Sequence, residues 1–202
     1  MDLMREAEVT AAWREFALRK YTLVEGLIPP LHLKSLQEYF QSLMDFGWVR
    51  LGDPDSPLRY NAHNDELVFF FQDQAASLAG RIVGRPVKAS HNHLISYLPG
   101  ATLRQHVDQA EHRYGLSLLL DFRGQSDHSQ PGKSWPLVLH AESGKEGIEI
   151  PQEIGEAVFY DACEVPHSRR GALPEGQVSS SLLLHFVAQE DRGPKEYSPF
   201  YY

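Results

Sequence analysis

The pattern of apolar residues changes from helical to strand-like near residue 87, and this change limits the folds open to the chain. Before that point, apolar residues recur at spacings of three and four, which predicts helices over about 2–20, 31–46 and 65–82. After it, short β-type runs alternate with turn residues, which is typical of an all-β core. The predicted strands cover 90–97, 116–122, 136–140, 147–150, 157–160 and 179–187.

These elements predict a mainly β protein with N-terminal helices, in the α+β class. A chain of 202 residues suits a single domain. Within it, we expect residues 1–86 to form a helical support layer on a β-sandwich or jelly-roll core at 87–190, followed by a tail at 191–202. Residues 52–57 are predicted to form a loop because they are rich in Pro and Asp. The polar stretch 123–135 is either a mobile surface loop or part of a substrate entrance.

Charge and cysteine content narrow the classes of partner and the compartment. The formal net charge of −8 repels phosphate backbones, which makes a nucleic-acid partner unlikely. The single cysteine, Cys163, excludes an internal disulfide framework and a multi-cysteine zinc site. Charged residues interrupt the N-terminus, and no run approaches the roughly 20 apolar residues of a membrane helix. We therefore expect a cytoplasmic protein without a membrane partner.

The pair His106 and Asp108 is the strongest candidate for chemistry. On an extended segment, side chains at positions i and i+2 point to the same face, so an imidazole and a carboxylate are offered together. His167, which follows the predicted strand at 157–160, is the candidate third ligand. Two imidazoles and one carboxylate on one side of a metal suit non-haem Fe(II), because they leave adjacent positions open. A surface His and Asp in a loop is the alternative interpretation of the pair.

The run from Tyr97 through Pro99 and Gly100 to His106 and Asp108 follows the pattern YxPGxxxxxHxD. This pattern resembles the signature of the prolyl-4-hydroxylase-like branch of the Fe(II)/2-oxoglutarate-dependent oxygenases. Residues 155–160 with the later His167 resemble its G-x-a-v-x-F…H segment, and 179–187 resembles its closing strand. Residues 21–43 are similar to its first strand and the helix after it. The resemblance implies a double-stranded β-helix that uses Fe(II), 2-oxoglutarate and O2 to hydroxylate an unactivated C–H bond.

The same resemblance implies residues that hold 2-oxoglutarate. Tyr97 would hydrogen-bond the cosubstrate, although a core-filling aromatic is the alternative. The family usually has Arg or Lys about ten residues after the distal histidine, where this chain has Gln177. Glutamine cannot replace that charge. We expect Arg169 to substitute for it if it continues the strand of His167, with Arg170 as the next candidate and neutral hydrogen bonds from Gln177 and Ser181. A cosubstrate held differently, or one other than 2-oxoglutarate, is the alternative. A solvated loop arginine is the other interpretation of Arg169.

The substrate is less constrained than the metal site. His93 shares a strand face with Tyr97, and Arg104 precedes the metal pair, so both are candidates for substrate binding. His112 is expected on a loop or the surface, and His185 in the core. A small molecule such as a free amino acid is the favoured substrate, and a peptidyl or protein residue is the alternative. A cupin-like metal-binding or ligand-binding protein without redox turnover also remains open.

Overall fold

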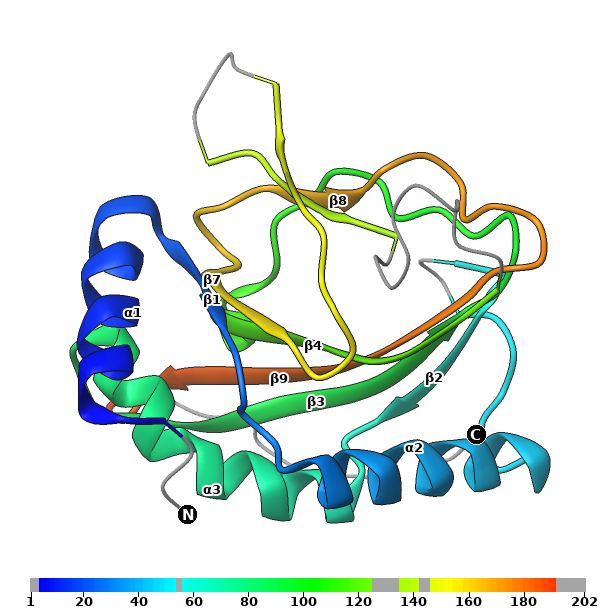
Figure 1. Cartoon of the computed structure of the whole chain (residues 1–202), viewed down its shortest axis with the longest axis horizontal. Helices are drawn as coiled ribbons and strands as arrows, with labels where there is room; N and C mark the ends of the chain where they lie inside the picture. Colours follow the sequence, from blue (N-terminus) through cyan, green and yellow to red (C-terminus); the bar gives the residue numbers. More distant parts are fainter. Residues whose placement is uncertain (1–3, 54–55, 125–134, 142–145, 192–202) are drawn as a thin grey trace.

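The computed structural model describes residues 4–53, 56–124, 135–141 and 146–191 (Figure 1). In these ranges the chain forms three α-helices, nine strands and one 3-10 turn. In chain order they are α1 (Glu6–Arg19), β1 (Tyr21–Val24), α2 (Pro30–Asp45), β2 (Arg59–His63), α3 (Glu66–Val83), β3 (Val87–Tyr97), η1 (Ala110–His112), β4 (Tyr114–Arg123), β5 (Leu137–Leu139), β6 (Ile148–Ile150), β7 (Ala157–Asp161), β8 (His167–Arg169) and β9 (Val178–Ala188).

The strands form two antiparallel sheets. The larger sheet has the order β1-β7-β4-β9-β3-β2, and the smaller has the order β6-β5-β8. Figure 1 shows the helices on one side of the larger sheet and β8 on its other side. This arrangement confirms the predicted mainly β fold with N-terminal helices.

Side chains on the larger sheet alternate between a helix-covered face and a face toward the smaller sheet. On β9, Leu182, Leu184 and Phe186 belong to the main hydrophobic cluster shared with the helices, whereas Ser181 and His185 line a cavity on the other face. Successive strand residues point to opposite faces, so one strand supplies both the apolar core and the polar site.

Helix ends follow local sequence signals. Asp65 caps α3 by accepting a hydrogen bond from the Val68 amide at 3.0 Å. Gly84 ends the same helix with φ +81°, a left-handed conformation that glycine adopts easily. Pro30 occupies the first turn of α2, where its missing amide proton has no helical partner to lose. These signals explain why the predicted helix limits lie close to the observed ones.

The sequence pattern alone did not reveal three short strands, β1, β2 and β8, of which β1 was expected only from the family resemblance. β2 carries only one fully buried apolar residue, Ala62, and it forms at the sheet edge by pairing with β3. β8 has three residues and depends on β5. Most of the predicted loop 123–135 and nearly all of the predicted tail 191–202 lie outside the described residues. Within the described part of the chain, no helix has the length and hydropathy needed to cross a membrane.

Candidate metal centre

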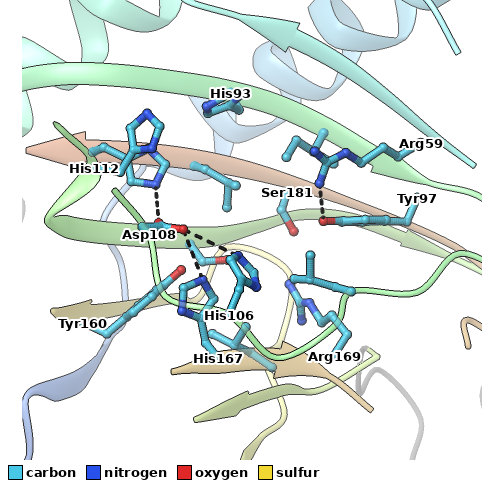
Figure 2. Close-up of a pocket in the computed structure, with 16 residues that line it drawn as sticks. Arg59, His93, Tyr97, His106, Asp108, His112, Tyr160, His167, Arg169 and Ser181 are labelled. Carbon is cyan, nitrogen blue, oxygen red and sulfur yellow. Dashed lines mark hydrogen bonds and ion pairs between the residues drawn. The ribbon is translucent and has the colours of Figure 1, made fainter. Parts of the chain in front are cut away.

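His106, Asp108 and His167 lie together between the two sheets, as the sequence predicts. His106 and Asp108 belong to the extended segment after β3, and His167 begins β8. The Asp108 amide donates a hydrogen bond to the Ala162 carbonyl at 2.9 Å, which anchors the segment on the chain that leads to β8. The ligand atoms of His106, Asp108 and His167 lie within 4.8 Å of one another. Figure 2 shows the three side chains converging on one point.

The distances within this group suit a shared metal ion. Asp108 Oδ1 is 3.5 Å from His106 Nε2 and 3.7 Å from His167 Nε2. Ligand atoms bound at about 2.1 Å lie about 3 Å apart when they are adjacent on an octahedron, so a small inward movement completes the site.

Both imidazoles are oriented by the backbone. His106 Nδ1 lies 2.8 Å from the Arg104 carbonyl oxygen, and His167 Nδ1 lies 3.1 Å from that of Val165. A carbonyl oxygen can only accept, so each Nδ1 carries the proton and each Nε2 presents a lone pair to the centre. This arrangement is the one that metal-binding histidines usually have.

Electrostatics keep the group in its metal-binding protonation state. Burial opposes the charged form of Asp108, but the surrounding imidazoles of His106, His185 and His167 outweigh burial and hold the pKa of the Asp108 carboxyl well below its usual range. Burial also lowers the pKa of His167 to about 4. At neutral pH the group therefore offers a carboxylate and a neutral buried imidazole, the forms that bind a divalent ion.

A cavity of about 150 Å³ extends from these ligands between the sheets. Tyr97, Arg169 and Ser181 line it, together with Leu183 and Ile95. Figure 2 shows Tyr97, Ser181 and Arg169 grouped to one side of the metal ligands. The cavity thus has one region with the candidate metal ligands and a second polar region that contains a cation.

Arg169 is buried and has no carboxylate partner among the described residues. Its side chain is 6% exposed, and its Nη1 donates to the Trp135 carbonyl oxygen at 2.6 Å. It shares a face of β8 with His167, because both are buried while Ser168 between them is partly exposed. Burial lowers the pKa of the Arg169 guanidinium. A buried cation of this kind is costly without an anion, so the cavity is suited to an anionic ligand.

Arg59 is a second cavity cation, and the sequence analysis missed it. It lies on β2 beside Tyr97 on β3, and its Nη1 donates to the Tyr97 hydroxyl at 3.2 Å. Unlike Arg169, it forms an ion pair with Asp53, at 2.5 Å from Nε to Oδ2. Arg59 therefore orients Tyr97. The sequence holds no signal for this role, because it depends on the pairing of β2 with β3.

The remaining predicted site residues, Ser181, Gln177 and Arg104, lie in three different places. Ser181 is buried in the cavity wall, and its hydroxyl has no hydrogen-bond partner among the described residues. Gln177 lies beside Gly124, just before β9, and is not among the residues that line the cavity, so its cosubstrate role stays a prediction. Arg104 is exposed and borders an outer groove, where it orients His106 through its carbonyl.

Three histidines lie on the far side of Asp108. His93 lines the cavity, as its shared face with Tyr97 predicts. His112 lies on η1, in the connection between β3 and β4, which fits its expected loop position, but it is partly buried and lines the cavity rather than the surface. His185 is buried as predicted, and its Nε2 lies 3.4 Å from Asp108 Oδ2.

An outer groove of about 730 Å³ leads to the metal ligands. It is lined by Arg59, Arg104, Val107 and Gln109, together with His106 and Asp108. Val107 is 49% exposed, as expected for the residue between two inward-facing ligands. A substrate can therefore approach the metal side without passing Arg169.

Comparisons with known proteins rest on structure alone, since no protein-family model and no curated protein matches the sequence. A prolyl-4-hydroxylase from Pseudomonas putida is 17% identical, with a TM-score of 0.70 over 90% of this chain and 99% of the other. HygX from Streptomyces hygroscopicus, solved with nickel, 2-oxoglutarate and hygromycin B, is 11% identical, with a TM-score of 0.66 over 94% and 90%.

A prolyl hydroxylase from Trichoplax adhaerens, in complex with a hypoxia-inducible-factor peptide, is 12% identical. Its TM-score is 0.66, and the match covers 94% of this chain and 97% of the other. At these identities the likeness confirms the predicted double-stranded β-helix, or jelly roll, shared with 2-oxoglutarate/Fe(II) oxygenases.

Proposed function

We propose that the chain is a non-haem iron, 2-oxoglutarate-dependent dioxygenase that hydroxylates a C–H bond of a small molecule. The observation that carries the proposal is the convergence of His106, Asp108 and His167 in a cavity that also contains buried Arg169, which has no carboxylate partner among the described residues. The shared fold with known oxygenases supports the same reaction class.

His106, Asp108 and His167 would hold Fe(II). Two neutral imidazoles and one carboxylate keep one side of the ion free for other ligands, which is the arrangement of non-haem iron oxygenases. When bound, Fe(II) with 2-oxoglutarate and O2 supplies the oxidising power that converts C–H to C–OH, while 2-oxoglutarate is converted to succinate and carbon dioxide. The protein's own part is to orient these groups and to exclude water.

Arg169 would hold the far carboxylate of 2-oxoglutarate. A guanidinium pairs with a carboxylate through two parallel hydrogen bonds, and burial strengthens them. Tyr97 and Ser181 line the same region and can donate hydroxyl hydrogen bonds to the same group. Because Arg169 lies two residues after His167 on β8, one short strand would position the metal and the cosubstrate together.

The substrate would enter through the outer groove next to Val107 and Arg104. A free amino acid or another small polar metabolite is the first class to test. A peptide is the alternative, because the groove is open along one side of the metal ligands. The structural neighbours include both kinds, an enzyme with hygromycin B and one with a peptide.

The test is an anaerobic titration of the protein with Fe(II) and 2-oxoglutarate, followed by succinate release under air. We expect a weak visible charge-transfer absorption when both are present, and succinate release that a panel of amino acids, small metabolites and proline-containing peptides stimulates. The His106→Ala variant should give neither signal. Absence of both signals from the unmodified protein at saturating Fe(II) and 2-oxoglutarate would contradict the proposal and favour a binding protein without redox turnover.

A further inference from the structure

A second histidine group lies against the first, on the other side of Asp108. His93 comes from β3, His112 from η1 and His185 from β9, and one ring nitrogen of each lies within 4.8 Å of the others. Their ring centroids are 4.6 Å apart for His112 and His185, 5.8 Å for His93 and His185, and 5.9 Å for His93 and His112. Figure 2 shows His93 and His112 across Asp108 from His106 and His167.

Two of these nitrogens are buried without a hydrogen-bond partner among the described residues. They are His112 Nε2 and His185 Nδ1. Buried polar atoms are nearly always paired, so each unpaired one calls for a bound group. His185 is 4% exposed, which leaves little access for bulk water.

Neighbouring groups fix which nitrogen each ring can offer. His93 Nδ1 lies 3.1 Å from the Asn61 side-chain oxygen, so it is engaged and Nε2 is left to bind. His185 Nε2 lies 3.4 Å from Asp108 Oδ2, so the carboxylate fixes its proton there and leaves the lone pair on Nδ1. A carboxylate behind a histidine is the usual support for a metal-bound imidazole.

We propose that His93, His112 and His185 form a second metal site for a divalent first-row transition ion such as Zn2+. Imidazole nitrogens favour Zn2+, Cu2+, Ni2+ and Fe2+ over the hard ions Mg2+ and Ca2+. Asp108 connects the two sites, because Oδ1 faces His106 and His167 while Oδ2 faces His185. The site does not depend on 2-oxoglutarate or on oxygenase turnover.

The second ion would join three separate elements at the back of the cavity. It would tie η1, which follows Asp108 directly, to strands β3 and β9 of the larger sheet. Asp108 would then be held by the iron ligands on one side and by metal-bound His185 on the other. Two further histidines lie against this group: the His63 ring stacks on His93 with centroids 4.5 Å apart, and the His91 ring meets His112 edge to face at 4.6 Å.

The first experiment counts metal ions per chain. The full-length protein is loaded anaerobically with Zn2+, freed of excess metal and analysed by mass spectrometry. We expect about two ions per chain for the unmodified protein, one for His93→Gln or His112→Gln, and one for His106→Ala. The His32→Gln variant, which changes an exposed side chain on α2, serves as the histidine control and should keep two ions per chain. One ion in the unmodified protein, unchanged by His93→Gln and His112→Gln, would overturn the proposal.

A second experiment examines the second metal site by itself, in a variant that lacks a ligand of the first site. In the His106→Ala background, Zn2+ titration by calorimetry should give one site, and adding His112→Gln should weaken it at least tenfold. X-ray absorption of the Zn2+-loaded His106→Ala protein should report a first shell with three imidazoles. Weak Zn2+ binding that His112→Gln leaves unchanged would overturn the proposal of a second site. A protein that binds one ion here yet never turns over 2-oxoglutarate would refute only the proposed function.

Discussion

His106 and His167 each donate a backbone amide hydrogen bond to the other's carbonyl oxygen, at 3.0 and 2.8 Å. This two-residue antiparallel bridge joins the segment after β3 to β8, which come from different parts of the chain. The two imidazoles therefore lie side by side, with centroids 4.3 Å apart, through main-chain contacts alone. The backbone fixes the ligands before any ion binds, which is what a preorganised site needs.

Replacing His167 by Ala should remove a metal ligand while leaving the bridge in place, because the bridge uses only backbone atoms. We expect a folded protein that loses one metal ion per chain and more than about 100-fold of its 2-oxoglutarate-dependent succinate release. Metal analysis and a succinate assay measure the two effects, with His32→Ala as the control. Full turnover in the His167→Ala protein would remove this histidine from the site.

Arg169→Met should raise the 2-oxoglutarate concentration needed for half-maximal turnover. A charge-assisted pair with a carboxylate contributes about 1.5–3 kcal/mol, so the rise should be about 10- to 150-fold. Metal content should not change. Steady-state assays at varied 2-oxoglutarate measure the effect.

Arg170→Met is the matched control for Arg169. Arg170 is the next residue, but its side chain is 63% exposed and pairs with Glu149 at the surface. Its loss should leave the 2-oxoglutarate requirement unchanged. Equal effects of the two substitutions would contradict the role of Arg169.

The ligand-free Arg169→Met protein should have the same melting temperature as the unmodified protein or a higher one. The substitution removes a buried charge that has no carboxylate partner among the described residues.

The pairing of His106 with Asp108 was predictable from sequence because its geometry is local, whereas His167 joins them only through a long-range bridge. His106 and Asp108 are two residues apart on an extended segment, so a shared face follows from strand geometry. The helices and the longer strands were also predictable, since each carries several buried apolar residues at a regular period.

Other parts of the site depend on pairing between distant segments, which a period cannot reveal. β8 is a strand because Leu137–Leu139 and His106 pair with it. The role of Arg59 depends on β2 lying next to Tyr97. His112 was expected on a loop, yet η1 turns its ring toward His185 and the cavity. In each case the deciding contact joins residues far apart in the chain.

Phe186→Ala should destabilise the fold strongly. Phe186 is fully buried in the core between the larger sheet and the helices, where it packs against Phe159 at 6.4 Å between ring centroids. Removing a buried ring leaves a cavity, and the expected loss is about 3–5 kcal/mol in the free energy of unfolding. Urea denaturation measures it. Phe46→Ala, at a side chain that is 72% exposed, should change the value by no more than about 0.5 kcal/mol.

The metal-free protein should lose stability as the pH falls from about 6.5 to about 4. Burial lowers the pKa of His167 from 6.5 to about 4, and that of His91 likewise to about 4. In this window the unfolded chain binds protons that the folded chain does not, so acid favours unfolding. The stability contributed by neutral His167 is fully present above pH 6.5 and is lost as the pH falls through its folded-state pKa. Its share is about 3 kcal/mol at most, from 1.36 kcal/mol per pKa unit.

Urea unfolding of the chelator-treated protein at pH 7.5, 6 and 5 measures this dependence. The partly exposed His91 contributes with the same sign but less, because solvent screens its charge. His167→Gln removes the buried titrating group, so the free energy of unfolding of this variant should fall less steeply between pH 6.5 and 5 than that of the unmodified protein. His32→Gln should retain the full slope, since exposed His32 lies on α2, away from the cavity. A free energy of unfolding that stayed constant or rose on acidification over this range would mean that the cavity histidines are solvated in the folded state. The preorganised ligand group would then not exist in solution.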